Sequence, residues 1–83
     1  MENEFKTYLS DQNLSKNTIT SYLYAIRQFE AKYDKLSKQN LRDYKVYLIE
    51  HYKPQTVNLR IRAINCYLES IKKEQWKLPS VKV

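Results

Sequence analysis

Two segments of the sequence place polar and basic side chains where an expected helix begins. In the stretch 54–71, read at about 100° per residue, the apolar residues share one face: Val57, Ile61, Ile64, Leu68 and Ile71. The opposite face carries Gln55, Leu59, Arg62 and Cys66. In the stretch 16–33, the face opposite the apolar positions carries Asn17, Ser21, Tyr24 and Gln28, with Thr20 beside it.

These two faces have the chemistry of a phosphate-binding surface. Neither has an acidic residue in its first two turns. Hydroxyl and amide side chains near a helix N-terminus suit phosphate contact, because free backbone N–H groups and the helix dipole add to their hydrogen bonds. Arg62 can contact a guanine edge or a phosphate, and Leu59 can meet a thymine methyl group. The pattern therefore fits a nucleic-acid contact as well as a solvated surface, and the residues alone leave both interpretations open.

Other reactive residue types form no catalytic or metal-binding set. The single Cys66 excludes an internal disulfide and, with the single His51, cannot build a zinc site. We expect His51 at the surface of a helix end, and we expect an inert Cys66. Five of the eight tyrosines lie on or beside apolar faces, where packing is their simplest role: Tyr8, Tyr22, Tyr33, Tyr44 and Tyr67. The sequence predicts no metal and no cofactor.

Composition limits the class of protein. The 83 residues suffice for one small domain, and the net charge of +6 predicts attraction to polyanions. The chain has no glycine and only two prolines, which disfavours an all-β fold that would need turn glycines. No run approaches the roughly 18 apolar residues of a membrane span, and no signal peptide opens the chain. We therefore expect a cytoplasmic protein that does not bind membranes.

The periodicity predicts four helices, at about 2–11, 16–33, 38–52 and 54–73. Ser15 and Ser37 are expected N-caps, Pro54 suits a first helical position, and Asn13 suits a left-handed residue that closes the first helix. Pro79 predicts that the tail 75–83 is extended. Val46 and Ile49 lie off the apolar stripe of the third helix. We therefore expect this helix to contact neighbours on two of its sides. The expected core consists of Ile19, Ile26, Phe29, Leu41, Leu48, Val57, Ile61, Ile64 and Leu68.

Three phrases in this order resemble one family. Leu14-Ser15-x-x-Thr18-Ile19-x-x-Tyr22 resembles the second helix of the core-binding domain of tyrosine recombinases and phage integrases. LSKQNLRDYKVYL resembles the third helix of that domain, and Gln55-Thr56-Val57-Asn58-x-Arg60-Ile61-x-Ala63-Ile64 resembles the fourth. The chain departs from the family pattern at Leu59, where an arginine is usual, and at Asn13, where glycine is common.

The resemblance implies an all-α fold, a four-helix SAM-like orthogonal bundle. It implies a domain that grips the core recombination site as half of a C-shaped clamp, with the second and fourth helices crossing the major groove of double-stranded DNA. A covalently linked catalytic domain would form the other half, and other recombinase protomers would be partners on DNA. We expect residues 1–75 to form the core-binding domain and residues 76–83 to begin the linker.

The N-terminal halves of the second and fourth helices supply the expected DNA contacts: Asn17, Thr18, Thr20, Ser21, Tyr24, Gln55, Thr56, Asn58, Leu59 and Arg62. The family's His-x-x-Arg motif is absent, since Pro54 stands three residues after His51. No tyrosine accompanies the arginines, lysine and histidines that activate the family's nucleophile. We therefore expect this chain to bind DNA without catalysing strand exchange.

Two alternatives belong to other classes. A small helical protein-interaction module would use Leu59, Val46, Ile49 and Trp76 against a partner protein. A standalone helix-turn-helix regulator is less favoured, because the expected connections do not give its short turn. Salt separates DNA binding from the first alternative, because phosphate contacts weaken steeply with salt and an apolar interface barely responds.

Overall fold

The computed structural model describes residues 2–83, so that Met1 of the expected domain lies outside the described residues. Four α-helices follow one another: α1 (Glu2–Asp11), α2 (Lys16–Lys32), α3 (Lys38–His51) and α4 (Pro54–Ser70). A short 3-10 turn, η1 (Glu74–Trp76), follows α4. There is no strand in residues 2–83. The all-α four-helix fold expected from the sequence is confirmed.

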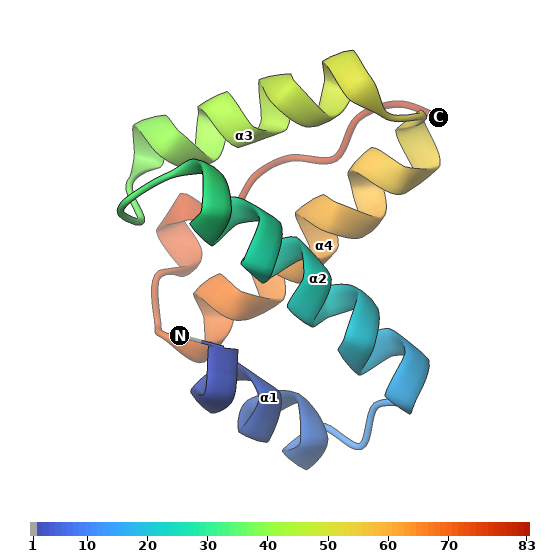
Figure 1. Ribbon diagram of the computed structural model, residues 1–83, viewed down its shortest axis with the longest axis vertical. Helices are drawn as coiled ribbons and strands as arrows, with labels where there is room; N and C mark the ends of the chain where they lie inside the picture. The colour runs from blue at the N-terminus through green and yellow to red at the C-terminus, as the bar shows by residue number, and fades with distance from the viewer. Residues whose placement is uncertain (1) are drawn as a thin grey trace.

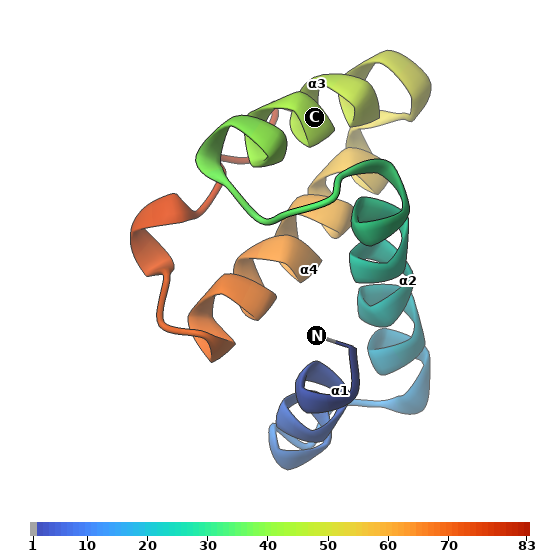
Figure 2. The same ribbon diagram turned by 60° about the vertical axis from the view of Figure 1, so that its left-hand side comes forward.

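The helices pack around a crossing of α2 and α4. Figure 1 shows α2 passing over α4, with the N-terminal halves of both helices on the same side of the crossing. In both views α1 and α3 lie at opposite ends of the bundle, with α4 between them (Figure 1, Figure 2). No helix within residues 2–83 combines the length and apolar character that crossing a membrane requires.

Local side-chain chemistry sets where the helices begin. The Ser15 hydroxyl accepts from the backbone N–H of Thr18 at 3.2 Å, and the Ser37 hydroxyl accepts from that of Asn40 at 3.1 Å. Each bond satisfies an N–H group that the helix itself leaves without a partner. Pro54 occupies the first position of α4, where its missing N–H costs nothing. These three helix starts are confirmed.

Left-handed residues end two helices in a chain without glycine. Asn13 follows α1 with φ 62°, as expected. Lys72 adopts φ 60°, and its N–H donates to Glu69 O at 3.1 Å while that of Lys73 donates to Leu68 O at 2.8 Å. This Schellman geometry closes α4 at Ser70, so the expected continuation to residue 73 is wrong.

One core joins all four helices. Its buried side chains include eight of the nine expected from the sequence: Ile26, Phe29, Leu41, Leu48, Val57, Ile61, Ile64 and Leu68. Ile19 is the exception, because it lies in the first turn of α2 at the rim of the core and is only partly buried. Val46 and Ile49 stay about half exposed, at 53% and 51%, so no helix covers this side of α3.

Tyr44 is a buried core residue, and the pKa of its hydroxyl is strongly shifted. The side chain is fully buried, its ring meets Phe29 edge-on at 5.4 Å between centroids, and its hydroxyl donates to Gln28 Oε1 at 2.7 Å. Burial disfavours the phenolate and raises the pKa of Tyr44 from 10.0 to about 12. The folded protein therefore holds this proton at a pH where the unfolded chain releases it.

This shift predicts a loss of stability in alkali. Between pH 10 and 12 the folded state binds more protons at Tyr44 than the unfolded state, so the free energy of unfolding falls as pH rises. We expect a contribution of up to about 2 kcal/mol, fully present below pH 10. Urea unfolding across this window measures it, and Tyr44→Phe should flatten the slope. An unchanged slope in Tyr44→Phe would contradict the assignment.

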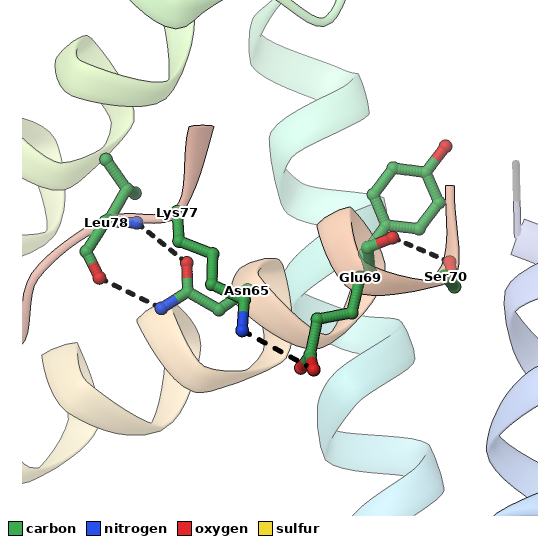
Figure 3. A network of polar contacts seen from close by, with 6 residues as sticks. Asn65, Glu69, Ser70, Lys77 and Leu78 are labelled. Carbon is green, nitrogen blue, oxygen red and sulfur yellow. Dashed lines mark hydrogen bonds and ion pairs between the residues drawn. The ribbon is translucent and has the colours of Figure 1, made fainter. Parts of the chain in front are cut away.

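The C-terminal tail folds back onto the helices. The extended conformation expected from residue 75 is wrong at its start, because Gln75 and Trp76 belong to η1; residues 77–83 then run between α3 and α4 without regular structure (Figure 1). The Asn65 side chain donates to Leu78 O at 2.9 Å and accepts from Leu78 N–H at 2.8 Å (Figure 3). Asn58 makes the same pair of bonds to Val81, at 2.9 and 2.8 Å.

Candidate nucleic-acid interface

A hollow of ≈ 300 Å³ lies between the N-terminal halves of α2 and α4. Five of the residues that the sequence predicted for DNA contact line it: Thr20, Ser21, Tyr24, Thr56 and Leu59. The helix crossing explains this grouping, because both N-terminal halves diverge from it on the same side (Figure 1). Residues more than thirty positions apart in sequence thus form one surface.

Arg60 is the remaining residue of the lining and its only charged group. Its guanidinium carbon lies 4.6 Å from the ring centroid of Tyr24 and 4.9 Å from that of Tyr52. Its Nη1 donates to Gln28 Oε1 at 2.7 Å. Two aromatic faces and one acceptor therefore fix the cation before any ligand arrives, which lowers the entropy that binding would cost.

Gln28 connects this cation to the core. Its Oε1 accepts from Arg60 and from Tyr44, and its Nε2 donates to the Tyr52 hydroxyl at 3.0 Å. The Gln28 bond, reinforced by nearby Arg60, lowers the pKa of Tyr52 from its ordinary value. The position of Arg60 therefore depends on a network that begins at the buried Tyr44.

The electrostatic field of the hollow favours an anion. No acidic residue lines it, and neither α2 nor α4 has an acid in its first turn. Thr56 stands in the first turn of α4, where the partial positive charge of the helix N-terminus adds to the charge of Arg60. Hydroxyl groups of Thr20, Ser21 and Thr56 can donate to phosphate oxygens. The hollow can therefore hold a phosphate, while Tyr24 and Leu59 supply apolar contact.

Four other predicted contact residues lie outside the lining. Asn17, Gln55 and Arg62 are exposed on the same two helices. The hydroxyl of Thr18 accepts from that of Ser15 at 3.0 Å, so Thr18 takes part in the cap of α2. Their roles as DNA contacts stay predictions.

Asn58 occupies a different environment from the other predicted residues. Both polar atoms of its side-chain amide bind the backbone of Val81 in the tail. The structure thus gives Asn58 a contact with the tail and does not bring it to the hollow. Asn65 makes the equivalent contact seven residues later, and no sequence motif singles it out.

The remaining reactive side chains lie apart from the hollow. Burial raises the pKa of the Cys66 thiol, which keeps it protonated and weakly nucleophilic. His51 is exposed at the end of α3 and stacks on Tyr47 with ring centroids 4.3 Å apart. Within residues 2–83 no three His, Cys, Asp or Glu side chains gather closely enough to hold a metal ion.

The chain matches one protein-family model. The description of that family is phage integrase, N-terminal SAM-like domain, and the match covers residues 2–78. Nearly all of the helical bundle and the first part of the tail therefore fall inside the match. No curated protein sequence and no solved structure is significantly similar to the chain.

Proposed function

Because the chain belongs to the phage integrase N-terminal SAM-like domain family, we propose that it is the core-binding domain of a site-specific tyrosine recombinase. In this role it grips the core recombination site as half of a C-shaped clamp around double-stranded DNA. A linked catalytic domain supplies the other half, and further recombinase protomers join it on the DNA. The family match supports the class, and the hollow between α2 and α4 supports the role.

The observation that carries the proposal is the fixed cation of Arg60 between the N-terminal halves of α2 and α4. A phosphate placed there meets a guanidinium, hydroxyl donors and no acidic group within the lining. Phosphate contacts set the register of a protein on the duplex, and side chains such as Tyr24 and Leu59 can then reach base edges or methyl groups. The five predicted residues in the lining are the contacts most directly supported.

We further propose that the domain takes no chemical part in strand exchange. Burial raises the pKa of Tyr33, Tyr44 and Tyr67, which makes their hydroxyls poorer nucleophiles. Tyr52 has a lowered pKa, but its hydroxyl is bonded to Gln28 and its ring lies against Arg60. Tyr52 serves to hold the cation, and the ring of the preceding His51 stacks on Tyr47 and forms a hydrogen bond to Tyr47 O at 2.9 Å.

The boundary between domain and linker is also a proposal. Division near residue 75 places the tail 76–83 in the linker. The tail bonds to Asn58 and Asn65 support a linker that leaves the domain along a fixed path. The position of the catalytic domain would then depend on these two amides.

Salt dependence tests the DNA-binding function. The isolated chain should bind duplex DNA with a dissociation constant in the micromolar range or above, because half of the clamp is missing. If about three to four phosphates are neutralised, raising the salt concentration from 50 to 200 mM should weaken binding by roughly 40- to 150-fold. Fluorescence anisotropy with one labelled duplex measures both quantities. Binding that is absent, or independent of salt, would contradict the proposal.

A further inference from the structure

A second and larger hollow, of ≈ 510 Å³, lies between α3 and the tail. One wall is a stripe along α3 and the other is the segment 75–79. The stripe repeats at helical spacing and consists of Lys38, Arg42, Lys45, Val46 and Ile49. We call this hollow the α3–tail groove, and it shares no lining residue with the hollow between α2 and α4.

The α3–tail groove combines positive charge with exposed apolar surface. Its lining holds four basic residues and no acidic one. Lys45 donates to Pro79 O at 2.7 Å, and Lys77 pairs with Glu69 at 3.4 Å (Figure 3). Lys38 and Arg42 are exposed, and no hydrogen bond or ion pair within residues 2–83 engages their side chains. Two cations thus remain available beside the half-exposed Val46 and Ile49.

Both walls are held in place without a ligand. The tail wall is fixed by the two bonds between Asn65 and Leu78, and Trp76 is covered by the Lys73 ammonium group 4.4 Å from its ring centroid. A further hollow of ≈ 220 Å³ shares Ile49 with the groove and is also lined by Val81 and Lys82. The tail therefore lines two hollows that have Ile49 in common.

We propose that the α3–tail groove binds an acidic protein segment that carries aliphatic anchor residues. Carboxylates of the segment pair with Lys38 and Arg42, and its aliphatic side chains cover Val46, Ile49 and Trp76. The aliphatic wall disfavours nucleic acid, because a phosphate backbone offers it no apolar partner. A second copy of the chain is disfavoured by the net charge of +6. This inference does not depend on DNA binding by the other hollow.

Trp76 gives a direct test, because it is the only tryptophan in the chain and it lines the groove. The probe is a synthetic peptide that alternates glutamates with leucines, titrated into the protein while tryptophan emission is followed. We expect saturable quenching or a blue shift. A peptide with serines in place of the leucines should bind at least about tenfold more weakly. Equal binding of both peptides, or no change in emission, would overturn the proposal.

Matched variants locate the site. Lys38 and Lys16 each hold the first position of a helix after a serine N-cap, but only Lys38 lines the groove. Lys38→Glu should weaken binding of the leucine peptide about fivefold to tenfold, and Lys16→Glu less than about twofold. Ile49→Ser should weaken it about tenfold with unchanged circular dichroism. Equal effects of Lys38→Glu and Lys16→Glu would overturn the assignment to this groove.

Two further results would reassign the surface. If duplex DNA displaces the leucine peptide and changes Trp76 emission, the groove belongs to a nucleic-acid interface and the proposal is wrong. If the peptide-free chain sediments as a dimer that Ile49→Ser dissociates, the groove is an interface between copies. If the chain fails to bind duplex DNA in the anisotropy experiment, Trp76 emission and sedimentation can still be measured. The DNA-binding proposal and the groove proposal can therefore fail separately.

Discussion

Ile64→Ala should lower the free energy of unfolding by about 2–4 kcal/mol, as large-to-small changes in a packed core do. The Ile64 side chain is 1% exposed and lies at the centre of α4 among the apolar residues that meet the other helices. A domain of this size is expected to have only about 4–12 kcal/mol of stability in total. Removal of three side-chain carbon atoms can therefore abolish a large share of the total stability. Urea unfolding followed by circular dichroism measures the change.

Ile49→Ala provides the matched control for this prediction. The chemical change is identical, but Ile49 is 51% exposed on α3. Its truncation loses little buried surface and should cost no more than about 0.5 kcal/mol. If the two variants lose the same stability, the packing of α4 in the core has been assigned wrongly.

The helices could be predicted because local and long-range signals agreed. Ser15 and Ser37 mark helix starts, and the apolar spacing after each of them fits a helical face. Burial at the ends of such a stripe is less predictable. Ile19 has the correct spacing but stands in the first turn of α2, where fewer neighbours cover it. The spacing of apolar residues predicts which face of a helix packs against the core. It does not predict how far along the helix neighbouring residues bury that face.

The end of α4 and the path of the tail could not be predicted from local propensity. Lys72 adopts the left-handed conformation that glycine usually provides, and a lysine gives no signal for it. The tail path depends on Asn58 and Asn65, whose amides each present one donor side and one acceptor side to an extended backbone. Such pairing requires the tail to return to α4, which is a tertiary event. The family motif predicts Asn58 as a DNA contact, and this role stays a prediction; the motif does not predict that the Asn58 amide binds the tail.

The site could be predicted as a surface but not as a network. The polar N-terminal halves of α2 and α4 pointed to the two helices that line the hollow, and their crossing gathered five of the expected residues. Arg60 is part of the family motif but is not among the predicted DNA contacts. Helical spacing places it near the apolar face. Its position makes sense only once Tyr24, Tyr52 and Gln28 are seen to surround it. A cation held by aromatic rings needs residues from three segments of the chain.

Thr20→Glu should weaken binding to duplex DNA by at least about tenfold at low salt. Thr20 is exposed and lines the hollow between α2 and α4. A carboxylate at this position repels phosphates and competes with them for the guanidinium of Arg60. The measurement is fluorescence anisotropy with a labelled duplex at fixed salt, after circular dichroism has shown that the helix content is unchanged.

Thr7→Glu separates the effect of position from the effect of charge. Thr7 is also exposed in a helix, on α1, and its substitution lowers the net charge of +6 by the same one unit. If attraction to DNA comes only from the overall positive charge, both variants should lose the same affinity. If the hollow is the docking surface, Thr7→Glu should lose about twofold or less, because its carboxylate lies outside the contact and is screened by salt. Equal losses would move the DNA interface away from α2 and α4, whereas a large loss confined to Thr20→Glu would place a phosphate beside Arg60.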